Sequence, residues 1–347
     1  MQIKQHKLVE AVKHVQGEYG GFCFGGQKPD GVYVHNVLPR GSVFPNGAKS
    51  AILLTFDVEG TYGNGSGDMQ LEITNYKRIC KKLSECNIAV TFNVVGQMAQ
   101  EQGPEFVEWM LEAGCEVAPH GYWHDMNKFY GGEHIYAGHY GAEQNYQQIR
   151  RGIDAIEKIR PGSVKGIRLP YGHFNEYSYN AMAKCGLVWA SNVGADDLLY
   201  PENGFGSSPF QIKLGQKLYP LVEIPLDSQT YDWAIWVADE ANNAEFVESV
   251  RTYCRMHDLP FERTPAGAVN IWMRRISDTI KLQTVFTLLC HPINLTIKSS
   301  HWKDAVEEFL FPVIDYLCVL QRDGIIWVCT CNKIAEFYSN FFLSKGV

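Results

Sequence analysis

Residues 116–125 read EVAPHGYWHD, a short apolar run followed by two histidines four residues apart. The run predicts a buried strand, and a tight turn after it lets His120 and His124 project from one side. Zinc in a catalytic site takes three protein ligands and leaves one position for water, so this pair needs one more ligand. The motif is short and also occurs by chance, in which case both histidines would be ordinary polar residues of a loop.

The missing ligand is expected in residues 51–60, AILLTFDVEG. The apolar run from Ala51 to Phe56 predicts a second buried strand, and two carboxylates follow it. Asp57 and Glu59 stand at positions i and i+2, which is one face if the strand continues. One of them could bind metal while the other takes a proton, or both could be surface residues.

Composition indicates a globular enzyme-sized chain. The 347 residues are 46% hydrophobic and 20% charged, and the net charge of −7 gives no electrostatic reason to expect nucleic acid. Residues 1–7 lack the apolar core of a signal peptide, and no stretch approaches a membrane span, so we expect a cytoplasmic protein. The ten cysteines contain no Cys-x-x-Cys, which favours reduced core thiols, Cys329 and Cys331 included.

Residues 1–48 contain glycine and turn signals and are expected to form an N-terminal arm packed on the main body, with a helix at 8–16. From residue 49 to 347, short apolar runs alternate with segments of helical period, which indicates parallel strands with crossover helices closing into an α/β barrel. The predicted strands are 51–56, 89–95, 116–119, 166–169, 187–191, 221–226, 284–290 and 324–330. The predicted helices are 74–86, 104–113, 141–159, 175–185, 243–258, 303–322 and 332–343.

Polar residues follow most of these strands. In a barrel, the carboxyl ends of the strands share one face, so these residues would meet there. Taken singly, Arg168 could be a surface ion-pair partner, Trp233 part of a hydrophobic wall and His291 a packed core histidine. The residues expected at this face are Asp57, Glu59, His120, His124, Arg168, Tyr171, Asp197, Asp232, Trp233 and His291.

The motifs resemble those of the polysaccharide deacetylases, the NodB-homology branch of the carbohydrate esterases. The resemblance spans about residues 45–335 and points to the subgroup of peptidoglycan deacetylase-like proteins and metal-independent allantoinases. It implies a distorted (β/α)7 barrel and metal-assisted hydrolysis of an N-acyl amide. The motifs that carry it are TFDVEG at 55–60, HGYWH at 120–124, RLPYG at 168–172 and LCH at 289–291.

The resemblance also implies a role for each matching residue. Asp57 would be the base, Arg168 would orient it through a bidentate contact, and His291 would be the acid. Most of the family has aspartate where Glu59 stands. The implied metal ligands are Glu59, His120 and His124.

The chemistry suggests further roles. The backbone N–H of Tyr171 could stabilise the oxyanion. Either Asp232 or Asp197 could hold His291 protonated, and the sequence does not choose between them. Trp123, Trp233 and Trp236 could form an apolar wall against the substrate, although burial in the core is the more common position for tryptophan. The aromatic segment 129–140 has the composition of a lid or of an ordered packing loop.

We therefore expect one divalent ion, with zinc first and Co²⁺, Ni²⁺ or Mn²⁺ as alternatives. The expected substrate is a small N-acylated sugar or sugar derivative, with no nucleic acid or membrane partner, and assembly with further copies of the chain stays open. One alternative is a metal-independent hydrolase of cyclic amides or ureides. Another is a barrel that binds carbohydrate without turnover.

Overall fold

The computed structural model describes residues 32–344 except 64–66, 125–139, 196–206, 228–229, 239, 299 and 301. Three sequence predictions lie outside the described residues: the helix at 8–16, Asp197, and residues 129–139 of the candidate lid.

Strand β2 (Ala51–Val58) lies at the centre of the fold, and all eight of its residues are buried. It pairs in parallel with β11 (Val285–Cys290), β3 (Thr91–Val94) and β12 (Trp327–Val328). Strand β3 pairs in turn with β4 (Glu116–Pro119). A strand buried on both faces is mostly apolar, and the one charged residue of β2, Asp57, is paired with the buried Arg168.

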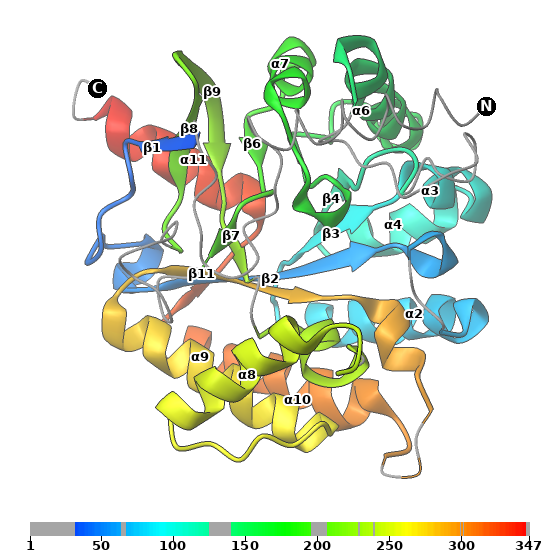
Figure 1. The fold of residues 1–347 in the computed structure, drawn as a ribbon, viewed down its shortest axis with the longest axis vertical. Coiled ribbons are helices and arrows are strands. Elements are labelled where there is room, and N and C mark those ends of the chain that lie inside the picture. The colour runs from blue at the N-terminus through cyan, green and yellow to red at the C-terminus, as the bar shows by residue number, and fades with distance from the viewer. Residues whose placement is uncertain are drawn as a thin grey trace.

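The second half of the barrel is less regular. Strand β5 (Gly166–Ile167) pairs in parallel with β6 (Trp189–Ala190), and β6 pairs with β9 (Lys217–Glu223). Beyond them, β7 (Gly194–Ala195) pairs with β10 (Leu226–Asp227). The hydrogen bond from Arg168 N to Pro119 O, 3.2 Å, joins this half to β4. The result is the predicted distorted (β/α)7 barrel, with strands surrounded by helices (Figure 1).

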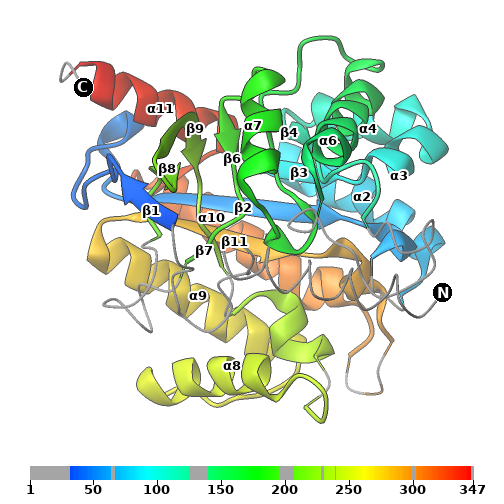
Figure 2. The same cartoon turned by 45° about the horizontal axis from the view of Figure 1, so that its top comes forward.

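The helices and short helical turns enclose the strands, and Figure 2 shows α11 running alongside β8 and β9, with α8 outside α9. The described α-helices are α2 (Met69–Glu85), α3 (Gly96–Gln102), α4 (Pro104–Glu112), α6 (Ala142–Glu157), α7 (Glu176–Lys184), α8 (Ala244–Met256), α9 (Pro265–Leu282), α10 (Phe311–Arg322) and α11 (Cys331–Leu343). The shorter turns are η1 (Pro45–Gly47), η2 (Gly60–Tyr62), η4 (Pro170–Gly172), η5 (Trp233–Val237), η6 (Pro292–Thr296) and η7 (Val306–Leu310).

Several elements differ from the prediction, and two of them matter most for the fold. Strand β8 (Phe210–Leu214) was not predicted, and it pairs antiparallel with both β9 and β1 (Val32–His35), so the sheet is not wholly parallel. Helix α9 was not predicted either, although Thr264 caps it and Pro265 occupies its first turn, which are ordinary helix-start signals. Part of the expected arm, residues 32–48, is described, and within it Leu38, Phe44 and Ala48 are buried.

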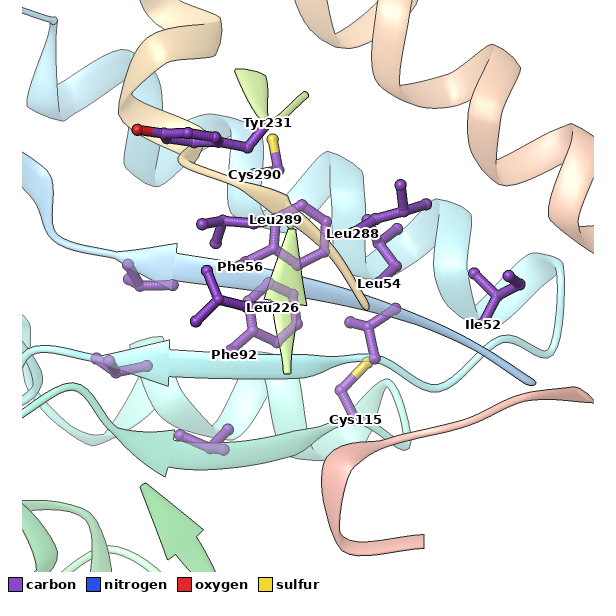
Figure 3. Close-up of a cluster of buried hydrophobic side chains, with 14 of the residues drawn as sticks. Ile52, Leu54, Phe56, Phe92, Cys115, Leu226, Tyr231, Leu288, Leu289 and Cys290 are labelled. Carbon is purple, nitrogen blue, oxygen red and sulfur yellow. The ribbon is translucent and has the colours of Figure 1, made fainter. Parts of the chain in front are cut away.

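The core places its aromatic side chains on the helix side of β2 and β3. Phe56 and Phe92 are paired residues of the two strands, and their rings stack at 4.9 Å (Figure 3). Because side chains alternate across a strand, the next pair in the register, Asp57 and Asn93, points to the opposite face. Packing on one face therefore sets the position of polar groups on the other.

No described helix combines the length and the apolar character that crossing a membrane requires.

A close contact between β5 and β6 provides a test of the barrel packing. A Cβ atom at Gly166 would lie 2.0 Å from Cδ2 of the Trp189 ring. We expect Gly166→Ala to lower the free energy of unfolding by about 1–3 kcal/mol, measured by urea denaturation. In a Trp189→Leu background the same substitution should cost much less, because the ring is gone. Equal costs in both backgrounds would contradict this packing.

Candidate active site and metal centre

Three buried side chains converge at the carboxyl ends of β2 and β4. Glu59 Oε1 lies 2.9 Å from His124 Nε2 and 3.3 Å from His120 Nε2. One ligand atom from each of the three residues lies within 4.8 Å of the others. Strand β2 ends at Val58, and Glu59 has αR dihedrals, so the carboxylate reaches the cluster from a turn rather than from a continued strand.

The backbone after β4 orients the two histidines. His120 Nδ1 lies 3.0 Å from the Arg168 carbonyl, which can only accept a hydrogen bond, so Nδ1 carries the hydrogen and Nε2 the lone pair. Gly121 has φ +68°, and a Cβ there would lie 2.7 Å from the Gln148 side chain. Gln148 also accepts a hydrogen bond from Trp123 N at 3.1 Å, which holds the turn between the histidines.

This donor set fits a divalent metal ion. His120 Nε2 and His124 Nε2 are buried and both face Glu59 Oε1, but neither makes a hydrogen bond of regular geometry within the part of the chain that the structure describes. Buried polar atoms are normally paired, so two such nitrogens facing one carboxylate oxygen fit a cation held between the three side chains. Burial raises the pKa of Glu59, but the neighbouring His124 and His120 outweigh burial and hold it well below its usual range. Two imidazoles and one carboxylate form a donor set typical of catalytic zinc.

Asp57 lies beside this cluster as a carboxylate. Its Oδ1 accepts hydrogen bonds from Arg168 Nη1 at 2.8 Å and from Asn93 Nδ2 at 2.9 Å. Its Oδ2 lies 3.9 Å from His120 Nε2. Burial raises the pKa of Asp57, but Arg168 and His120 outweigh burial and lower it, so the group is ionised at neutral pH.

Arg168 contacts Asp57 differently from the prediction. The expected bidentate contact is wrong, since Nη1 alone reaches Asp57 and also donates to Thr55 Oγ1 at 3.0 Å. The other nitrogens, Nε and Nη2, donate to Ser191 O and Oγ at 3.2 and 2.9 Å. Ser191 thus accepts the hydrogen bonds of the two nitrogens that could otherwise have completed a bidentate contact with Asp57. The guanidinium is therefore held by Asp57, Thr55 and Ser191.

His291 approaches the cluster from β11, with Nε2 3.7 Å from Glu59 Oε1. Its Nδ1 lies 2.9 Å from Asp232 Oδ1, while Asp232 Oδ2 accepts hydrogen bonds from His291 N at 3.0 Å and Asn294 Nδ2 at 2.8 Å. Burial lowers the pKa of His291, but Asp232 outweighs burial and raises it to about 10. Of the two aspartates predicted as supports, the structure places Asp232 against His291, and Asp197 lies outside the described residues.

Tyr171 occupies a strained turn next to the histidines. It has φ 58° inside η4, a left-handed conformation that costs a non-glycine residue about 1–3 kcal/mol. Its ring packs against His124 with the centroids 4.6 Å apart. The turn brings the Tyr171 backbone to the same barrel face as the proposed ligands.

The three tryptophans considered as a wall have different environments. Trp233 is half-buried and stacks on Tyr231 at 6.0 Å, and Tyr231 lies 5.9 Å from the His291 ring. Trp123 is half-buried under the Arg151 guanidinium. Trp236 is buried against Phe309 at 4.8 Å and belongs to the core, which leaves Trp123 and Trp233 near the site.

Sequence analysis missed Asn93, Ser191 and Asn294, the residues that hold Asp57, Arg168 and Asp232. Only Asn93 carried a usable signal, because it is a polar residue inside the apolar run TFNVV and near a strand end. Ser191 and Asn294 are common residue types whose partners lie far away in sequence.

Comparison with known protein families shows which family the segment that carries most of this site matches. Residues 45–190 match the family model described as polysaccharide deacetylase. Residues 45–190 belong to the polysaccharide deacetylase family. The resemblance drawn from the motifs is therefore confirmed. This deacetylase segment contains Asp57, Arg168 and the three proposed ligands, while Asp232 and His291 follow it in the chain.

Solved structures share the fold of the polysaccharide deacetylase segment and extend the match along the chain. A candidate polysaccharide deacetylase from Mycobacterium smegmatis is 21% identical, with a TM-score of 0.63 over 88% of this chain and 95% of that one. Another from Pseudomonas aeruginosa PAO1 is 14% identical, with a TM-score of 0.59 over 87% and 95%. Puue allantoinase is 15% identical, with a TM-score of 0.51 over 86% and 93%. No curated protein sequence gives a significant match.

The high pKa of His291 depends on Asp232, and Asp232→Asn should lower it towards the ordinary value near 6.5. The titration of the His291 ring in metal-free protein, followed by NMR, measures this shift. A histidine whose pKa is raised by folding stabilises the fold below about pH 6.5 and loses that contribution as the pH rises towards 10. The stability difference between wild type and Asp232→Asn should therefore shrink over that interval, and a pH-independent difference would contradict the assignment.

Proposed function

We propose that the chain is a metal-dependent hydrolase that removes an N-acyl group, in the first instance N-acetyl, from an amino sugar or sugar derivative. One observation carries the proposal: the Asp57 carboxylate lies beside the cluster of Glu59, His120 and His124, and His291, directly after strand β11, faces Glu59 while Asp232 holds its other nitrogen. A base and an acid around one metal position are what amide hydrolysis needs. The family match supports the deacetylase reaction class.

A divalent ion held by Glu59, His120 and His124 would polarise the amide carbonyl and lower the pKa of the attacking water. Zinc suits this donor set, and Co²⁺, Ni²⁺ or Mn²⁺ accept the same ligands.

Asp57 would take the proton from water. Its Oδ1 is occupied by Arg168 and Asn93, so Oδ2 is the oxygen available as the base. The positive charge of Arg168 keeps the carboxylate ionised. Hydrogen bonds to Ser191 fix the guanidinium, which in turn keeps Asp57 in one orientation. Because the proton acceptor is already aligned, little reorganisation is needed as water attacks.

His291 would give a proton to the departing amine. Its Nδ1 hydrogen is engaged by Asp232, so Nε2, which faces Glu59, is the nitrogen whose proton can be transferred. A pKa raised to about 10 keeps the imidazole protonated at neutral pH, as an acid catalyst requires. The Tyr171 backbone N–H would stabilise the negative charge that develops on the carbonyl oxygen.

Substrate class follows from the family and from the aromatic groups near the site. Trp123, between the two histidines in sequence, and Trp233, which stacks on Tyr231 beside His291, are half-buried aromatic groups that could contact a sugar or an acyl methyl group. An acetylated carbohydrate needs such apolar faces together with a polar centre.

Metal-free hydrolysis of a cyclic amide or ureide is less consistent with the site. The fold similarity to an allantoinase concerns the barrel alone. The grouping of Glu59, His120 and His124, whose ligand atoms lie within 4.8 Å of one another, supports a mechanism with metal over one without it.

The proposal is tested by screening purified protein, before and after chelation, against N-acetylated and N-formylated amino sugars, nucleotide-linked acetamido sugars and allantoin. Released acid and primary amine are both measured. We expect acetate and amine in equal amounts from an acetamido sugar, lost on chelation and restored by zinc. Turnover of allantoin by fully chelated protein, with no acetamido sugar attacked, would favour the metal-independent alternative instead.

A further inference from the structure

Asn93 is a buried polar residue in an otherwise apolar part of β3. Its side chain is withdrawn from water, as are those of Phe92 and Val94 on either side. Asn93 Oδ1 has no hydrogen-bond partner among the residues that the structure describes. A buried acceptor without a partner costs stability, so packing alone gives no reason for asparagine at this position.

The other end of the amide has a specific partner. Asn93 Nδ2 donates to Asp57 Oδ1 at 2.9 Å, and the β2–β3 register places the two residues side by side. Rotating the amide would direct Oδ1 at a carboxylate, where two acceptors repel, so the donor must face Asp57. Asn93 is thereby held in the orientation that leaves its own oxygen unpaired.

The hydrogen bond restricts Asp57. The terminal torsion of aspartate is broad and has no sharp rotamer wells, so a single donor does not fix the carboxylate plane. Arg168 supplies one donor to Oδ1, from a nitrogen that it also shares with Thr55. Asn93 supplies the second donor to the same oxygen, from the neighbouring strand.

We propose that Asn93 is a positioning residue for the base: with Arg168 it saturates Oδ1 of Asp57, so that Oδ2 alone is presented to the attacking water. This inference rests on the proposed function, in which Asp57 is the base. It assigns Asn93 a role that lowers stability and raises turnover. If Asn93 had a structural role instead, replacing it would lower stability and activity together.

The test compares wild type with Asn93→Leu, which has a similar shape and no donor. Acetate release from the acetamido sugar that the screen finds to be turned over gives kcat and KM, and melting temperature and metal content are measured on the same samples. We expect kcat to fall about tenfold or more, because a hydrogen bond to a charged group is lost. KM and metal content should stay nearly unchanged, and the melting temperature should stay equal or rise.

Two further variants sharpen the comparison. Asn93→Ala removes the donor without bringing a second carboxyl group against Asp57, so its kcat should also fall. Thr287→Val is the matched control, because Thr287 on β11 is buried and its Oγ1 has no partner in the described part of the chain. It should match the thermal behaviour of Asn93→Leu and leave kcat unchanged.

Asn93→Leu with wild-type kcat would overturn the inference. A fall in melting temperature and metal content in step with kcat would also overturn it, because that result is expected if Asn93 only supports the fold. Asp57→Asn, assayed in parallel, separates this failure from failure of the proposed function. If Asp57→Asn is inactive and Asn93→Leu fully active, only the role of Asn93 is lost, whereas an active Asp57→Asn would remove Asp57 as the base and this inference with it.

Discussion

The ion pair between Arg168 and Asp57 is the interaction on which the site depends. Both side chains are almost fully withdrawn from water, with 1% and 5% of their surface exposed. A buried charge without a partner is costly, and removing one member of such a pair commonly costs about 3–5 kcal/mol. The remaining donors of Arg168 must also be satisfied, which Ser191 and Thr55 accomplish. Strands β2, β5 and β6 are therefore tied to one another at the face where the ligands gather.

Charge balance extends from this pair to the rest of the cluster. Glu59 is a second buried carboxylate, and the structure places two imidazoles within 3.3 Å of its Oε1. Asp232 is a third, and its partner is His291. Each of these three acids thus has a cationic or imidazole neighbour, and the neighbours differ from one acid to the next. In the proposed mechanism these neighbours give the carboxylates three roles: Asp57 accepts a proton, Glu59 binds metal and Asp232 holds the acid His291 protonated.

The features that could be predicted from the sequence are those that depend on neighbouring residues. Apolar runs followed by polar residues located β2, β4 and β11, and the common face of a barrel brought Asp57, His120 and His291 together. What sequence could not supply were contacts between distant segments. The single-nitrogen contact of Arg168 depends on Ser191, 23 residues away, and the choice of Asp232 for His291 spans 59 residues. The antiparallel strand β8 was missed because its residues, FQIKL, alternate over only five positions.

The division of labour between Asp57 and the ligand cluster is tested most directly by measuring metal content and acetate release together in Asp57→Asn and His120→Ala. The account predicts that Asp57→Asn retains about one divalent ion and loses turnover, because the base is removed and the ligands stay. His120→Ala should lose both metal and turnover. An Asp57→Asn protein that loses its metal, or a metal-free protein with full turnover, would contradict it.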